Sequence, residues 1–92
     1  LMNMLHKSRF ALGILGDGQL ARLCAEKANL RGIKTLVYTL DPLHSPCKEL
    51  ASLFPGKSWK DEKSLKEFLS LVDVAVLENE FIPTDILLAA ES

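Results

Sequence analysis

The 92-residue sequence has few of the features that mark specialised proteins. Its two cysteines, Cys24 and Cys47, form no C-x-x-C pair, and with His6 and His44 they give no metal-ligand spacing. We therefore expect free thiols in a cytoplasmic protein and no metal site. No apolar run is long enough to cross a membrane, and the first ten residues lack the apolar centre of a signal peptide.

An excess of charge of one sign is also missing. The chain has 11 basic and 12 acidic residues, and lysines and acids are intermingled. With no basic stripe, the sequence favours neither a nucleic acid nor a membrane as a partner. Its 48% apolar and 25% charged residues are ordinary for a globular protein, and the length allows one small domain. Function must therefore be sought in short motifs.

The most informative stretch begins with the apolar run Ala11–Leu15 and continues through two close glycines into a helical pattern that ends near Leu30. This order predicts a strand, a tight turn and a helix. Gly16 can take a backbone conformation forbidden to other residues, and Gly18 lets a ligand approach the main chain. Unpaired N–H groups at the helix start favour a polar or anionic ligand. The alternative is a glycine turn that only closes the strand–helix unit.

The rest of the chain alternates between strand and helix patterns. We expect strands at 10–15, 34–39 and 74–77, a weaker one at 57–59, and helices at 18–30, at 47–53, after Asp61 and after Pro83. Such alternation predicts an α/β, Rossmann-like fold: an open parallel sheet of about four strands in order 3-2-1-4, with helices on both faces. Residues 1–9 are expected to be a disordered lead-in to a domain at 10–92, in a chain cut from a larger protein.

Polar side chains follow several of the expected strands. Glu78 and Glu80 come directly after the buried strand at 74–77, and Asp41 follows the strand at 34–39. Parallel strands share a carboxyl edge, so these acids should meet Gln19 there. Asp41 would bind ribose hydroxyls or serve only the turn before a proline, and Glu80 could be a solvated loop acid.

The chemistry of this edge favours binding over catalysis. No nucleophile, histidine or metal set stands beside the two glutamates, so we expect no catalytic residue. Carboxylates accept hydrogen bonds from hydroxyl and amine donors and repel phosphates. The backbone N–H groups of the glycine turn and the Gln19 amide instead donate hydrogen bonds to acceptors on a ligand. A ligand with both kinds of group, such as an amino-heterocycle nucleotide, fits this division.

Three motifs together resemble those of 5-(carboxyamino)imidazole ribonucleotide synthases, the ATPase subunits of phosphoribosylaminoimidazole carboxylase. They are Gly-Asp-Gly-Gln-Leu-Ala-Arg at 16–22, Leu-Asp-Pro at 40–42 with Ser-Pro at 45–46, and Glu-Asn-Glu-Phe-Ile-Pro at 78–83. The family typically has G-x-G-Q-L-G-R-M and E-F-E-N-I-P in the first and last motifs. Here Ala21 and Leu23 replace the usual Gly and Met, and Phe and Asn have exchanged places around Glu80.

The resemblance implies an N-terminal, pre-ATP-grasp domain of a ligase that carboxylates 5-aminoimidazole ribonucleotide with bicarbonate in purine biosynthesis. ATP and Mg would be bound by ATP-grasp domains outside this chain, which would be inactive alone and part of a homodimer when full-length. The substrate-binding residues it suggests, together with those expected from the strand ends, are Gly16, Gly18, Gln19, Leu20, Asp41, Glu78 and Glu80.

Two other functions remain open. A free-standing NAD(P)- or nucleotide-binding Rossmann module would use Gly16, Gly18, Ala21 and Asp41, although Gln19 and Leu20 would then be unexplained. A truncated domain without ligand affinity is the other possibility.

Overall fold

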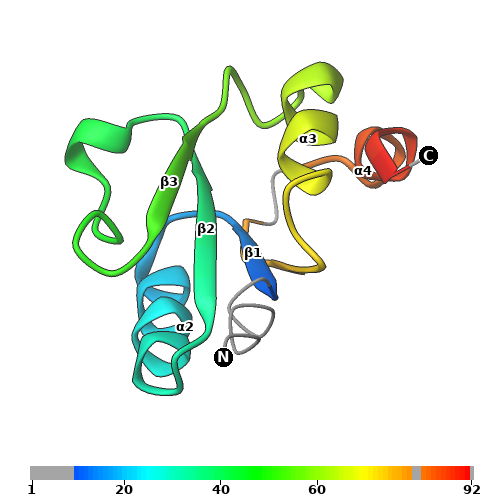
Figure 1. Cartoon of the computed structure of the whole chain (residues 1–92). Helices are drawn as coiled ribbons and strands as arrows, with labels where there is room; N and C mark the ends of the chain where they lie inside the picture. Colours follow the sequence, from blue (N-terminus) through cyan, green and yellow to red (C-terminus); the bar gives the residue numbers. More distant parts are fainter. Residues whose placement is uncertain (1–9, 80–81, 92) are drawn as a thin grey trace.

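The computed structural model describes residues 10–79 and 82–91 (Figure 1). The expected lead-in at 1–9 and the expected site residue Glu80 lie outside the described residues. Along the chain the elements are β1 (Ala11–Leu15), α2 (Gln19–Leu30), β2 (Lys34–Thr39), the short 3-10 helix η1 (Pro42–His44), β3 (Ser52–Pro55), α3 (Glu62–Leu69), β4 (Val74–Leu77) and α4 (Thr84–Glu91).

The four strands form one parallel sheet in the order β3-β2-β1-β4, which confirms the predicted topology. Leu15, the last residue of β1, pairs with Tyr38 of β2 and with Leu77, the last residue of β4. The carboxyl ends of these strands therefore lie side by side. Figure 1 shows α2 on one face of the sheet and α3 with α4 on the other.

The sheet separates two apolar clusters because successive side chains of a strand point to opposite faces. Ile14 and Val37 pack with α2, whereas Leu15 and Tyr38 pack with α3 and α4. The Tyr38 hydroxyl is buried with its hydrogen bonds satisfied, since it donates to the Ser58 carbonyl at 2.7 Å and lies 2.9 Å from the Ser64 hydroxyl. The buried strand residues of the two clusters, Ile14 and Leu15 of β1 and Val37 and Tyr38 of β2, thus lie toward the carboxyl ends of their strands.

Local sequence signals specify several element ends as expected. Gly32, just after α2, has a φ of +70°, the left-handed conformation common after a helix C-terminus. Asp61 caps α3, since its carboxylate accepts a hydrogen bond from the Ser64 backbone N–H at 3.1 Å.

Two predictions between β2 and α3 are wrong. Residues 46–50 form turns instead of starting a helix, and the third strand is β3 rather than residues 57–59. Leu53 packs against the cluster beneath α2 and Phe54 against the opposite one, so this segment contributes to both sides of the sheet. Pairing with β2 outweighs the helix-start signal at Ser45, whose hydroxyl instead accepts from the Cys47 backbone N–H at 3.1 Å.

The prediction that residues 74–77 form a buried strand is half right. The strand exists, but Val74, Val76 and Leu77 are 50%, 38% and 53% exposed. β4 is the edge of the sheet, while α2 packs over β1 and β2. Val74 and Val76 therefore lie on a part of the sheet that no described helix covers, whereas Ala75 packs against the cluster beneath α3 and α4.

Candidate functional site: the glycine turn and Glu78

The glycine turn joins the end of β1 to the start of α2. Gly16 has a φ of +135°, which side-chain-bearing residues rarely adopt. Gly18 is the N-cap of α2, and no side chain caps the helix there. The first N–H groups of α2 therefore face the rim of the sheet with their partial positive charge, as the sequence predicts.

The end of β4 is fixed to the same turn by the backbone. The N–H groups of Glu78 and Asn79 both donate to the carbonyl of Leu15, at 3.0 and 2.9 Å. This shared acceptor brings Glu78 beside the residue that precedes the glycines. The predicted meeting of the turn and the acidic motif at one rim is confirmed for Glu78.

The Glu78 side chain occupies the hollow that the glycines leave. A Cβ at Gly18 would lie 2.6 Å from Glu78 Oε2, and a Cβ at Gly16 would overlap Oε1. The sequence predicts that a ligand approaches the main chain in this hollow, whereas part of the hollow holds the protein's own carboxylate. A phosphate at the turn would meet this negative charge, while an amine or hydroxyl would meet a hydrogen-bond acceptor.

Asp17 and Thr39 form a second polar contact at the rim, one that sequence reasoning missed. The Thr39 hydroxyl donates to Asp17 Oδ2 and accepts from the Asp41 backbone N–H at 3.1 Å. Thr39 is fully buried at the end of β2, so its hydroxyl needs such partners. A threonine that follows the apolar run Leu36–Tyr38 at the end of a strand is the signal that could have indicated this contact.

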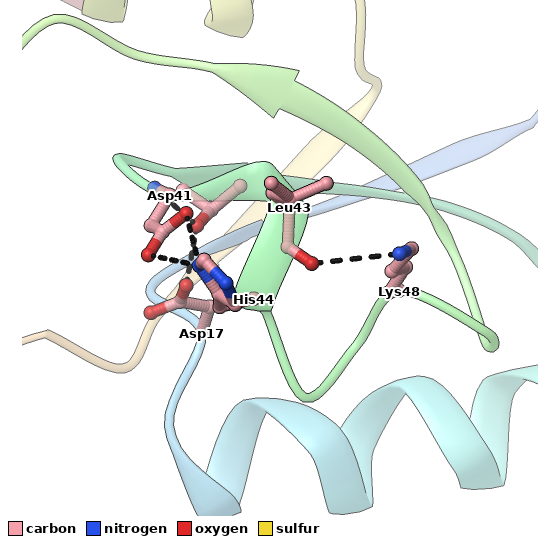
Figure 2. Close-up of polar contacts among 6 residues, drawn as sticks. Asp17, Asp41, Leu43, His44 and Lys48 are labelled. Carbon is pink, nitrogen blue, oxygen red and sulfur yellow. Dashed lines mark hydrogen bonds and ion pairs between the residues drawn. The ribbon is translucent and has the colours of Figure 1, made fainter.

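Asp41 lies at the edge of this network and has the geometry of a turn residue (Figure 2). It is exposed, precedes η1, and its carboxylate lies 3.0 Å from His44 Nδ1. Asp41 was expected either to bind ribose hydroxyls or to serve the turn before Pro42, and this geometry favours the turn.

Gln19 and Leu20 begin α2 and are both exposed, so they are accessible at the rim beside Gly18. Within residues 10–79 and 82–91, no group of three or more His, Cys, Asp or Glu side chains is placed to hold a metal ion. The site therefore consists of a glycine turn, exposed side chains at a helix start, and the two carboxylates of Asp17 and Glu78.

Cys47 lies beneath the site, fully buried in the cluster against α2. Burial raises the pKa of its thiol, and the carboxylate charges of Asp17 and Glu78 raise it further, against the opposing hydrogen bond with Ser45. The thiol in the folded protein therefore stays protonated at a pH where an unfolded cysteine ionises.

This pKa difference gives a stability prediction. Because the unfolded chain loses the Cys47 proton first, the free energy of unfolding should fall as pH rises above about 8.5. Urea unfolding under reducing conditions between neutral pH and pH 10 should show a shallower fall for Cys47→Ala than for the unmodified chain. An equal fall in the free energy of unfolding with pH in Cys47→Ala and in the unmodified chain would contradict the prediction.

Comparison with known proteins places this chain in a family. Residues 10–92 match the ribonucleotide synthetase preATP-grasp domain, which is nearly the whole chain. The chain belongs to this family. Among its relatives, N5-carboxyaminoimidazole ribonucleotide synthase of Staphylococcus saprophyticus is 37% identical over 82 residues, which are 88% of this chain and 21% of the relative. The corresponding Staphylococcus haemolyticus enzyme is 35% identical over 74 residues, 80% of this chain and 20% of the relative.

Solved structures share the fold of this preATP-grasp domain. Staphylococcus aureus N5-carboxyaminoimidazole synthetase complexed with ADP superposes with a TM-score of 0.77 and 33% identity, over 89% of this chain and 22% of that chain. The Thermus thermophilus N5-carboxyaminoimidazole ribonucleotide synthetase gives a TM-score of 0.70 with 27% identity, over 87% and 22% of the two chains.

The chain thus spans about a fifth of the length of these relatives. Among the described residues, no helix is both long enough and apolar enough to span a bilayer.

Proposed function

We propose that this domain forms one wall of the substrate site of an ATP-dependent ligase of purine biosynthesis. The substrate is 5-aminoimidazole ribonucleotide, which the full-length enzyme carboxylates with bicarbonate. Family membership supports the enzyme class, because the relatives are named N5-carboxyaminoimidazole ribonucleotide synthases. The position of the Glu78 carboxylate against the glycine turn supports the proposal that these residues form a wall of the substrate site.

In this proposal the two halves of the site bind different groups of the substrate. The Glu78 carboxylate accepts a hydrogen bond from the exocyclic amine or a ribose hydroxyl. The N–H groups at the start of α2 and the Gln19 amide donate to oxygen or ring-nitrogen acceptors. Gly16, Gly18 and Leu20 complete the wall, and Glu80 is a second candidate acid.

The described residues do not fit the cofactors that the reaction requires. They include no cluster of metal-ligating side chains, and the Glu78 carboxylate beside the turn disfavours a polyphosphate. We propose that the parts of the full-length enzyme beyond this chain bind ATP and Mg, and that the full-length enzyme is a cytoplasmic homodimer.

The 92-residue chain should accordingly show no bicarbonate-dependent ATP hydrolysis. Phosphate release would be measured with ATP, Mg, bicarbonate and 5-aminoimidazole ribonucleotide, with a full-length relative as the active control. Hydrolysis above the protein-free rate that depends on bicarbonate would contradict this expectation.

The alternative of an NAD(P)-binding module is disfavoured by the same geometry. The pyrophosphate of NAD(P) would approach the turn where the Glu78 carboxylate already lies. Asp41, the acid expected to bind the ribose, is paired with His44. Saturable NADH binding that Asp41→Ala abolishes would favour this alternative instead.

A further inference from the structure

The glycine turn has a single side chain by which the rest of the fold can hold it. Residues 16 and 18 are glycines, so Asp17 is the only residue of the turn that carries a side chain. Glycine loses more conformational freedom on folding than any other residue, so a turn of this composition is intrinsically loose. The contact that the Asp17 side chain makes is therefore important for where the start of α2 lies.

This contact is with Thr39, the last residue of β2. The Thr39 hydroxyl donates to Asp17 Oδ2, and its oxygen accepts from the Asp41 backbone N–H at 3.1 Å. A hydroxyl has one proton, and because its oxygen faces the Asp41 N–H, that proton is directed to the carboxylate. Thr39 is fully buried, so little water can compete for the hydroxyl. Figure 2 shows Asp17 beside the loop that carries Asp41 and His44.

Backbone hydrogen bonds hold the two ends of the turn. Before the turn, the carbonyl of Leu15 accepts from two N–H groups at the end of β4. After it, the carbonyl of Gly18 accepts from the Arg22 N–H at 3.0 Å. Neither set involves β2, so the side-chain bond between Asp17 and Thr39 connects the turn to that strand. Loss of this bond should leave the sheet and α2 in place and loosen the turn between them.

We propose that Thr39 is a positioning residue for the substrate and acts through Asp17. By holding Asp17 at the end of β2, Thr39 fixes the turn and the first N–H groups of α2 beside the Glu78 carboxylate before the substrate binds. A site that already has its bound geometry loses less conformational entropy on binding, which raises affinity. The inference rests on the proposed function and adds a residue that does not itself touch the substrate.

Isosteric substitution of Thr39 in the 92-residue chain tests the inference. Thr39→Val removes the hydroxyl and keeps the shape, so it should weaken binding of 5-aminoimidazole ribonucleotide about fivefold, the factor that one net hydrogen bond contributes. Thr39→Ser keeps the hydroxyl and should bind within about twofold of the unmodified chain. Thr35→Val is the matched control, because Thr35 is 4% exposed near the amino end of the same strand, and its affinity should not change.

A second variant removes the other half of the bond from a less buried position. Asp17→Ala should weaken binding by a factor similar to that of Thr39→Val, and the double variant should show no further loss, because both changes remove the same contact. Losses that multiply in the double variant would count against a shared role.

Backbone relaxation measured by NMR in the ligand-free variants separates positioning from a general loss of stability. In Thr39→Val, the order parameters of Asp17 and Gly18 should fall from about 0.85 toward about 0.6, the range from rigid to flexible backbone. Val37, fully buried in β2, should keep its value, and Thr39→Ser should restore the turn.

Three results would overturn the inference and leave the proposed function standing: Thr39→Val binds the ribonucleotide as tightly as the unmodified chain, Thr35→Val loses as much affinity, or Thr39→Ser fails to restore binding. Failure of the unmodified chain to bind the ribonucleotide would instead overturn the proposed function, and the inference with it.

Discussion

Gly16→Ala should lower the free energy of unfolding by about 3 kcal/mol. Gly16 has a φ of +135°, and its added Cβ would overlap Glu78 Oε1 and lie 3.0 Å from the Asn79 backbone nitrogen. The variant therefore combines a strained backbone with a steric clash, part of it against main chain. Urea unfolding followed by circular dichroism would measure the loss.

Gly32→Ala is the matched control for this effect. Gly32 also has a positive φ, +70°, but a Cβ there would meet no atom within 4 Å. It should cost only the backbone strain, about 1 kcal/mol. The double variant Gly16→Ala with Glu78→Ala should recover part of the loss, because the carboxylate clash is removed. Equal losses at the two glycines, with no recovery in the double variant, would contradict the contact between Glu78 and the turn.

Glu78→Gln should weaken binding of 5-aminoimidazole ribonucleotide by about 10- to 100-fold. A hydrogen bond to a charged acceptor contributes about 1.5–3 kcal/mol, and glutamine keeps the shape of the side chain while it removes the charge. The same change should raise affinity for inorganic phosphate, since the repelling carboxylate beside Gly18 is lost. Dissociation constants for both ligands would come from ligand titrations of the 92-residue chain.

Asp85→Asn provides the control for net charge. Asp85 is an exposed acid in the first turn of α4, so its replacement removes one charge from a residue that belongs neither to the glycine turn nor to the acidic motif. Substrate affinity should be unchanged in this variant. A comparable loss in both variants would indicate a general charge effect and would count against a direct contact with Glu78.

The sequence predicted the topology because alternating strand and helix patterns restrict a parallel sheet to few connections. It also placed Glu78 beside the glycines, since β1 and β4 are neighbours with a shared carboxyl edge. The position of β3 could not be predicted in the same way. Local signals at Ser45 and Pro46 resemble a helix start, while the pairing that creates β3 depends on distant β2.

Side-chain positions at the site also depended on three-dimensional context. No spacing rule indicates that the Glu78 carboxylate fills the hollow at Gly16 and Gly18, or that Thr39 donates to Asp17 across 22 residues of sequence. The exposure of Val74 and Val76 could likewise not be predicted, because the sequence of an apolar strand does not indicate whether the strand lies at the centre or at the edge of a sheet.

The most direct test of the central claim is a titration of the isotope-labelled chain, followed through its backbone amide NMR signals. We predict that 5-aminoimidazole ribonucleotide shifts the signals of Gly16–Gln19, Glu78 and Asn79 saturably, and that NADH leaves them in place. Unmoved signals at these residues with the ribonucleotide, or saturable shifts with NADH alone, would contradict the assignment of the glycine turn and Glu78 as a substrate wall.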